Sequence, residues 1–249
     1  MRKSTPLDGT SVCTEGSASP LTVGHARFDL RSLGIDVGMP PKWLDVVILD
    51  GDLRVVYQKR RVLPEHIPAL LASWRPDVVA IDAPPSCAIS GSSRAADRHL
   101  ARLGIHAFPV PPKERASSAF YGWMRVGFQT FQVAAKCGYP RYRAGPVQRT
   151  AIEVFPHASA VALAGFLPPS GTRRHRWRRE VLAAQGVPVE GIRSKDLVDA
   201  AVAALTGVRA LEGRFFPVGD PEEGVVIFPV ARIEDHFVPL KTHDGRELP

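Results

Sequence analysis

The composition of the chain is that of a folded protein with a basic surface. It has 249 residues, of which 45% are hydrophobic, so it can bury a core of ordinary size and is neither disordered nor fibrous. Its apolar stretches, such as residues 197–205, are interrupted by charge and fall short of the roughly 20 residues that a membrane span requires, so no transmembrane segment is expected. The formal net charge of +7 favours anionic partners such as nucleic acids or phosphorylated small molecules.

The chain is expected to form one domain over about residues 29–240, because no internal repeat or linker divides it. Residues 1–28 are rich in Ser, Thr and Gly and lack the apolar core of a secretory signal. They are therefore predicted to be a flexible leader, and residues 241–249 a C-terminal tail.

The cysteines carry no sign of a metal or redox site. Cys13, Cys87 and Cys137 are far apart and form no Cys-x-x-Cys pair for zinc or for redox exchange. A reducing cytoplasm is the location that fits them best.

The predicted domain begins with three strands. The run 32–38 is β-prone and is stopped by a glycine. Two further β-prone runs, 44–48 and 53–57, flank an Asp50-Gly51 step, which can adopt the positive φ angles of a tight hairpin. These features predict an antiparallel meander.

A helix is predicted next, over residues 64–74, because apolar residues recur there at spacings of three and four. Such a helix is a crossover, which allows the following strand, 77–82, to lie parallel to the first strand. Asp36 and Asp82 then end neighbouring strands at the same rim of the sheet. Two carboxylates at one rim repel each other unless a proton or a cation lies between them, so a divalent metal site is the first hypothesis. The alternative is that each Asp caps the turn that follows it.

The remaining predicted elements are mostly helical, with one strand and one hairpin. They are helices over 92–103, 157–163, 176–185 and 194–205, an aromatic and helical region over 120–135, a strand over 150–155, and a hairpin of 214–218 and 225–229. Ser92 or Ser93 is the expected cap of the first of these helices, and Ser194 of the last. That last helix is Ala-rich and should end at Gly207, and its composition implies close approach to a sheet.

Two acids share a face of that Ala-rich helix. Asp196 and Asp199 are three residues apart and could point at the same sheet rim as the strand acids. Asp196 lies in the first turn, where an acid also complements the helix dipole without any catalytic role. Asp199 lies deeper among apolar neighbours and is the stronger candidate.

Five motifs in this order resemble the domain of unknown function 429 family, whose members are predicted nucleases of the RNase H-like fold. The motifs are Gly34-Ile35-Asp36-x-Gly38, Ile81-Asp82-Ala83-Pro84-x-Ser86, Arg94-x-x-Asp97, Glu153-Val154-Phe155-Pro156-His157-Ala158-Ser159 and Lys195-Asp196-x-x-Asp199-Ala200. The resemblance spans roughly residues 33–229. It implies an α/β protein with a mixed sheet, its first three strands antiparallel and the later ones parallel, flanked by helices.

The resemblance also implies a metal centre. RNase H-like nucleases hold one or two Mg²⁺ ions with acids from the first strand, the fourth strand and a late helix, which are Asp36, Asp82 and Asp199 in this chain. These three are the expected metal ligands and catalytic residues, with Mg²⁺ or Mn²⁺ as the cofactor and phosphodiester hydrolysis as the reaction. Glu153 is a further catalytic candidate and fourth ligand, with a salt bridge to an Arg as the alternative.

Five more residues are candidates for substrate binding. Arg94, Asp97 and Arg98 share one helix, so Arg94 could meet a phosphate while Asp97 orients it; an internal salt bridge is the alternative. Lys113 follows a Pro-rich turn and could face the same cleft or lie in a solvated loop. His157 stands at a helix start, where it could shuttle protons or only bond the backbone.

The run 173–179 combines five arginines and a histidine with Trp177. Such a run is typical of single-stranded nucleic-acid grooves, and equally of a solvated helix face with the Trp packed inward.

The sequence therefore predicts a metal-dependent nuclease or phosphodiesterase that acts on DNA or RNA. The main alternative is a non-catalytic RNase H-like module that binds nucleic acid or protein through its Arg-rich face. A third hypothesis is an actin-like or sugar-kinase-like phosphotransferase, because Asp36-x-Gly38 also resembles the first phosphate motif of those proteins. Those proteins need a duplicated domain to enclose ATP, whereas this chain is expected to form a single domain, which argues against the third hypothesis.

Overall fold

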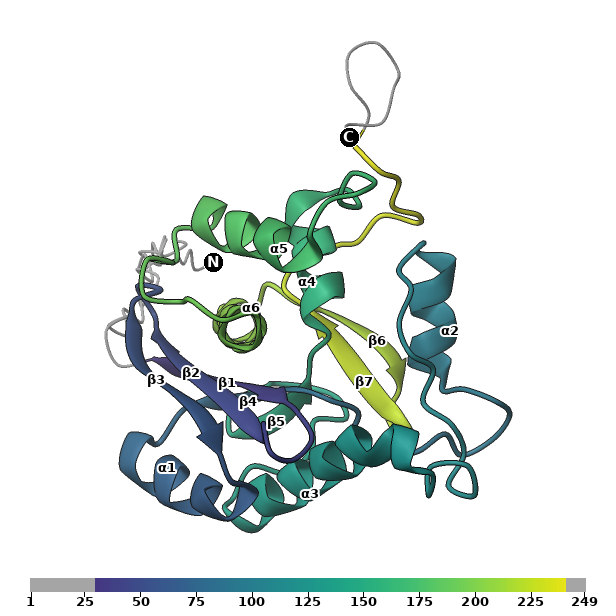
Figure 1. Cartoon of the computed structure of the whole chain (residues 1–249), viewed down its shortest axis with the longest axis horizontal. Helices are drawn as coiled ribbons and strands as arrows, with labels where there is room; N and C mark the ends of the chain where they lie inside the picture. The colour runs from purple at the N-terminus through teal and green to yellow at the C-terminus, as the bar shows by residue number, and fades with distance from the viewer. Residues whose placement is uncertain (1–29, 241–249) are drawn as a thin grey trace, which may run out of the picture.

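The fold is built on a mixed sheet, described here from a computed structural model that covers residues 30–240. The predicted leader and tail, and Cys13, lie outside the described residues. Within them the sheet has seven strands in the order β3-β2-β1-β4-β5-β7-β6 (Figure 1). The strands are β1 (Arg31–Val37), β2 (Leu44–Asp50), β3 (Val55–Val62), β4 (Val78–Asp82), β5 (Thr150–Glu153), β6 (Phe216–Asp220) and β7 (Gly224–Phe228).

The directions of the strands confirm the predicted α/β class. Strands β1, β2 and β3 form an antiparallel meander. Strands β4, β5 and β7 then continue the sheet parallel to β1, and β6 closes it as the antiparallel partner of β7. This is the RNase H-like arrangement that the resemblance implies.

Helices cover both faces of the sheet. In Figure 1, α1 and α3 lie below the central strands, α4, α5 and α6 lie above them, and α2 flanks the β6–β7 hairpin. The α-helices are α1 (Ile67–Trp74), α2 (Ala95–Arg102), α3 (Gly122–Lys136), α4 (Pro156–Ala164), α5 (Arg174–Ala184) and α6 (Lys195–Leu211), and two 3₁₀ turns, Pro64–His66 and Ala119–Tyr121, precede α1 and α3. The crossover from β3 to β4 is thus made by α1, as predicted.

Helix α6 crosses β1 closely because both elements carry glycine where they meet. A side chain added at Gly34 of β1 would collide with the carbonyl oxygen of Ala200 on α6, and one added at Gly207 would collide with the Ser32 hydroxyl. The prediction that α6 ends at Gly207 is therefore wrong. This glycine allows contact with the sheet, and the helix continues for another turn to Leu211.

The hairpin turn between β2 and β3 forms where predicted, but its backbone differs from the expectation. The Asp50 carboxylate accepts hydrogen bonds from the backbone N–H groups of Asp52 and Arg54, at 3.0 and 2.9 Å. The positive φ, 63°, falls on Leu53 and not on the Asp-Gly step. A side-chain cap on two amides thus fixes this turn.

Helix caps are partly as predicted. Ser194 caps α6, because its Oγ accepts a hydrogen bond from the Leu197 N–H at 3.0 Å. Helix α2 starts later than expected, with Arg94 and not Ser92 or Ser93 as its cap residue; the Arg94 N–H donates to the Asp97 carboxylate at 3.1 Å. Asp97, which was expected to orient Arg94 toward a phosphate, therefore also stabilises the first turn of α2.

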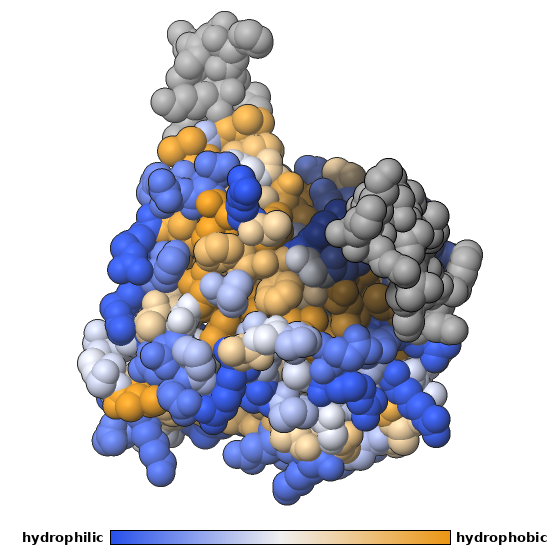
Figure 2. Space-filling view, turned by 180° about the vertical axis from the view of Figure 1, so that it is seen from behind, coloured by the Kyte–Doolittle hydropathy of each residue, from blue (hydrophilic) through white to orange (hydrophobic). Residues whose placement is uncertain are grey.

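The surface is mixed in character. On the face shown in Figure 2, apolar residues gather across the middle of the molecule and hydrophilic residues surround them. In the part of the chain that the structure describes, no helix combines the length and the apolar character that crossing a membrane demands.

Candidate carboxylate site and adjoining cavity

Asp36 and Asp82 lie opposite each other at the rim of the sheet. Strands β1 and β4 are parallel and in register, with Asp36 paired to Asp82. The residues before them, Ile35 and Ile81, are fully buried in the apolar core, which fixes both strands up to their last residues. The two half-buried carboxyl groups are joined by a hydrogen bond. The sequence prediction that these acids converge is therefore realised in the fold.

The environment of this pair favours protonation. Burial raises the pKa of Asp36 and of Asp82 well above its usual value, and it is the largest cause for both. The negative charge of Asp199 raises both pKa values further, and the charge of Asp36 raises the pKa of Asp82. Such a pair is stabilised by whatever places positive charge between the two groups, whether a proton or a cation.

Asp199 lies close enough to influence this pair but its oxygens are already engaged. Arg178 of α5 donates from Nε and Nη2 to the two carboxylate oxygens of Asp199, at 2.5 and 2.8 Å. Burial raises the pKa of Asp199, and Arg178 opposes that rise. Asp196 is held by weaker ion pairs, to Lys42 at 3.8 Å and to Arg60 at 3.9 Å.

The donor chemistry of the rim fits one hard divalent cation. Within residues 30–240, no group of three or more His, Cys, Asp or Glu side chains is arranged to hold a metal ion. Asp36 and Asp82 form no salt bridge with any described residue, and two carboxylates with water are an oxygen donor set that suits Mg²⁺ or Mn²⁺. Asp199 would join this set only by releasing Arg178.

Glu153 lies in a buried ion-pair network. It ends β5 and accepts hydrogen bonds from Arg94 Nη1 at 2.8 Å and Nη2 at 2.7 Å. Arg94 also donates to Asp97 at 3.1 Å, and its side chain is only 2% exposed. For Glu153, Arg94 and Asp97 the structure thus shows the salt-bridge alternative, which anchors α2 to the sheet.

Of the other substrate-binding candidates, His157 is near the carboxylates and two are not. His157 lies in the first turn of α4 and is 8% exposed. Burial and the positive charges of Arg178 and Arg174 lower its pKa to about 4, so the ring is neutral near pH 7. Arg98 donates to the Ser93 carbonyl and Lys113 is exposed, and neither lines the cavity described next.

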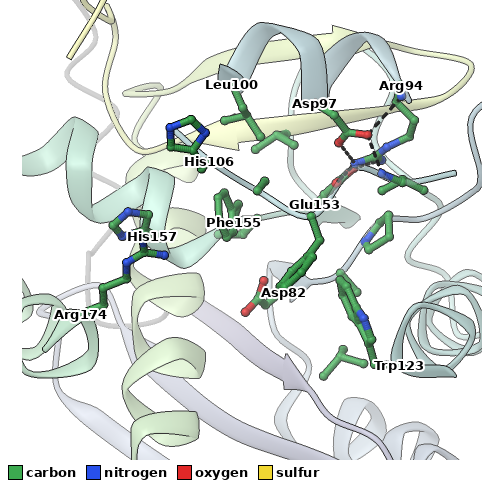
Figure 3. Close-up of a pocket in the computed structure, with 18 of the residues that line it drawn as sticks. Asp82, Arg94, Asp97, Leu100, His106, Trp123, Glu153, Phe155, His157 and Arg174 are labelled. Atoms are coloured by element: carbon green, nitrogen blue, oxygen red, sulfur yellow. Dashed lines mark hydrogen bonds and ion pairs between the residues drawn. The ribbon is translucent and has the colours of Figure 1, made fainter. Parts of the chain in front are cut away.

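A cavity of about 460 Å³ opens beside Asp82. Figure 3 shows the Asp82 carboxylate between His157 and Arg174 on the left and Trp123 on the right, with the Arg94–Asp97–Glu153 network above it. The cavity therefore joins the end of β4 to residues of four helices, α2, α3, α4 and α5.

Sequence reasoning named Arg94 and His157 but did not single out Arg174, Arg178 or Trp123, which also line this cavity. Arg174 and Arg178 belong to the Arg-rich run 173–179, whose arginines have different partners in the fold. Arg174 and Arg178 line the cavity, whereas Arg179 donates to the Val189 carbonyl at 2.7 Å. Trp177 packs inward, 6.0 Å from His157 between ring centroids, as the alternative reading of the run expected. Trp123 gave no specific signal, because the 120–135 region had only a general aromatic and helical character.

The sheet order, the flanking helices and the acid pair at the rim define an RNase H-like α/β protein with a candidate carboxylate centre. The chain belongs to the family described as "Protein of unknown function (DUF429)", whose model matches residues 34–223. No curated protein matches the chain. Among solved structures it is similar to RuvC of Thermus thermophilus, with a TM-score of 0.40 and 16% sequence identity over 74% of this chain and 97% of that chain.

Proposed function

We propose that this protein is a metal-dependent phosphodiesterase that cleaves nucleic acid, with its chemistry centred on Asp36 and Asp82. The observation that carries the proposal is the register of these acids on adjacent parallel strands, together with an environment that raises both pKa values. Enzymes place groups with shifted pKa values where charge must be held or moved.

The residues that would hold Mg²⁺ or Mn²⁺ are Asp36 and Asp82, with Asp199 as the third ligand of the family pattern. Bound there, the metal would lower the pKa of an attacking water and neutralise charge on the scissile phosphate and the leaving oxygen.

The remaining residues would bind and orient the substrate. Arg178 faces the cavity while it holds Asp199, so it brings positive charge to the edge of the acid pair. His157, with a pKa of about 4, is a weak proton acceptor near pH 7, so we assign it hydrogen bonding and not proton shuttling. The net charge of +7 would favour a polyanionic substrate.

Cleavage of a labelled nucleic-acid panel tests this proposal. The panel contains single-stranded, duplex, hybrid and branched DNA and RNA with Mg²⁺ or Mn²⁺, and the proteins are the full chain, Asp36→Asn and Asp82→Asn. The matched control is Asp235→Asn, because Asp235 is exposed and does not line the cavity. We expect cleavage by the parent chain and the control and none by the rim variants.

Full activity in both rim variants would refute the proposal. Absence of cleavage by every protein, combined with salt-sensitive binding that survives Asp36→Asn, would favour a nucleic-acid-binding module instead.

We further propose that residues 29–240 act as one domain in a reducing cytoplasm. The family match over residues 34–223 lies within this range, and the two cysteines of the described residues, Cys87 and Cys137, are free thiols.

A further inference from the structure

The cavity beside Asp82 has a cationic side that the proposed hydrolysis does not require. Arg174 lines it from the first turn of α5, beside His157 (Figure 3). Among residues 30–240 Arg174 forms no salt bridge, whereas Arg178 is paired with Asp199 and Arg94 with Glu153. The charge of Arg174 is therefore available to an anion that enters the cavity.

Two polar atoms, in residues on different sides of the cavity, have no partner among the described residues. His157 Nδ1 and Arg94 Nε are buried without a hydrogen bond to any described residue, in side chains that are 8% and 2% exposed. Both residues line the cavity. Because buried polar groups are nearly always hydrogen-bonded, these atoms indicate a place that a polar ligand or ordered water fills.

Aromatic side chains form another part of the lining. Trp123, Phe155 and Phe108 all line the cavity. Phe108 is 68% exposed and packs edge to face against Phe120, which is 61% exposed, with 5.9 Å between ring centroids. Exposed aromatic groups beside a basic pocket are the usual stacking surface for an unpaired base.

The size of the cavity limits what can enter. About 460 Å³ lies within the range of roughly 300–1,000 Å³ that is typical of small-molecule pockets. One nucleotide fits such a space, but a base that remains stacked in a duplex cannot reach it. A nucleotide must be unpaired or at a strand end to enter.

We propose that this cavity binds one unstacked nucleotide, with its phosphate at Arg174 and its base against the aromatic side chains. As a statement about substrate class this rests on the proposed function, since it places a strand end or an unpaired nucleotide next to Asp82. The same chemistry describes a free mononucleotide, and the test separates the two sources.

The first experiment measures binding without cleavage, by calorimetry of the full chain in EDTA. The probes are the ribonucleoside and deoxyribonucleoside 5′-monophosphates, the corresponding nucleosides, and inorganic phosphate. The variants are Arg174→Ala, with Arg176→Ala as its control on the same helix, and Phe108→Ala, with Ile89→Ala as its control. Arg174 and Arg176 are both exposed, as are Phe108 and Ile89 at 68% each, but only Arg174 and Phe108 line the cavity.

We expect at least one monophosphate to bind, and Arg174→Ala to weaken it by about tenfold or more, as for loss of a charged hydrogen bond. Phe108→Ala should weaken monophosphates and nucleosides by about fivefold or more and leave inorganic phosphate unchanged. Both controls should stay within about twofold of the parent chain. Absence of monophosphate binding, or equal losses in Arg174→Ala and Arg176→Ala, would overturn the inference.

The second experiment identifies the source of the nucleotide. A short single-stranded oligonucleotide and the same strand annealed to its complement compete with the bound monophosphate. Displacement by the single strand alone supports a strand end, and displacement by neither supports a free mononucleotide. Displacement by the duplex as strong as by the single strand would overturn the cavity as a site for an unstacked nucleotide.

The two proposals can fail separately. Because binding is measured in EDTA, nucleotide binding without any cleavage would contradict only the proposed hydrolysis. Cleavage that depends on Asp36, in a protein that binds no monophosphate, would contradict only the cavity inference.

Discussion

Arg178 and Asp199 form a bidentate ion pair between α5 and α6, with nitrogen–oxygen distances of 2.5 and 2.8 Å. Their side chains are only 12% and 15% exposed. Arg178 opposes the rise that burial imposes on the pKa of Asp199, and it also lowers the pKa of Asp82. One guanidinium therefore stabilises the charged forms of two of the three acids in the candidate centre.

Removal of this guanidinium should destabilise the fold. Arg178→Met leaves the carboxylate of Asp199 buried without its partner, and we expect the free energy of unfolding to fall by about 2–3 kcal/mol at pH 7. Urea denaturation in EDTA measures this. Arg176→Met, on the exposed side of the same helix, should change it by less than about 0.5 kcal/mol. Equal effects in the two variants would show that the ion pair contributes nothing beyond surface charge.

The raised pKa values of Asp36 and Asp82 predict that the free energy of unfolding falls as pH rises. Because the pKa values of Asp36 and Asp82 are raised in the folded state, the folded protein binds more protons than the unfolded chain above their ordinary value of 3.8. The free energy of unfolding should therefore decrease from about pH 4 upward through the raised pKa values. Asp82→Asn should remove much of this decrease and stabilise the metal-free protein at pH 7 by on the order of 1–2 kcal/mol.

Urea denaturation across this pH range, in EDTA, checks the Asp82→Asn variant against Asp235→Asn. A variant that loses stability at pH 7, with a pH dependence like that of the parent chain, would contradict the raised pKa values.

Addition of a divalent cation should stabilise the folded protein when Asp36 and Asp82 have lost their protons. Mg²⁺ or Mn²⁺ bound between Asp36 and Asp82 stabilises only the folded state, so the melting temperature should rise with metal concentration. The rise should be absent in Asp36→Asn and unchanged in Asp235→Asn, and it should be larger at pH 8 than at pH 5 because the acids lose their protons. Thermal denaturation monitors this without any substrate. An equal rise in all three proteins would place the metal elsewhere.

His157 should give a pH dependence of the opposite sign. Its pKa is lowered from 6.5 to about 4 in the folded protein. Between about pH 4 and pH 6.5 the unfolded chain therefore binds a proton at this ring and the folded protein does not. Stability due to the neutral ring should be lost as pH falls from about 6.5 to about 4, by on the order of 3 kcal/mol in total. His157→Gln should flatten this part of the profile, whereas His175→Gln, exposed on α5, should not. The comparison of variants separates this slope from that of the acid pair.

Local sequence features predicted the rim acids but not their partners. Asp36 and Asp82 follow short β-prone runs joined through a crossover helix, and these two patterns suffice to bring them together. The pairing of Asp199 with Arg178 depends on how α5 packs on α6, which no spacing within either helix encodes.

The misplaced end of α6 has a similar cause. A glycine at position 207 is a stop signal in an isolated helix, but here it is the residue that permits contact with β1. Likewise, the aromatic lining of the cavity includes Phe108 and Trp123, which lie on a loop and on a helix that meet only in the folded chain.

The buried pair of Arg94 and Glu153 should be the most sensitive ionic contact among the described residues. The two side chains are 2% and 6% exposed. Glu153→Gln therefore leaves the Arg94 guanidinium in the core with Asp97 as its remaining carboxylate partner, and we expect a loss of about 3–5 kcal/mol in the free energy of unfolding. Glu222→Gln is the control, because Glu222 pairs with Arg143 on the surface, where the side chains are 64% and 53% exposed and the loss should be under about 1 kcal/mol.

The double variant Arg94→Met with Glu153→Gln tests the cause of that loss. If the loss comes from the uncompensated charge of Arg94, the double variant should be more stable than Glu153→Gln alone, since no buried cation remains and Asp97 keeps its hydrogen bonds from the backbone N–H groups of residues 94 and 110. Urea denaturation of the four proteins of this cycle gives the coupling between the two residues. A double variant that is as unstable as the sum of the single changes would mean that the residues act independently, and that the α2 wall of the cavity is held by packing and not by this ion pair.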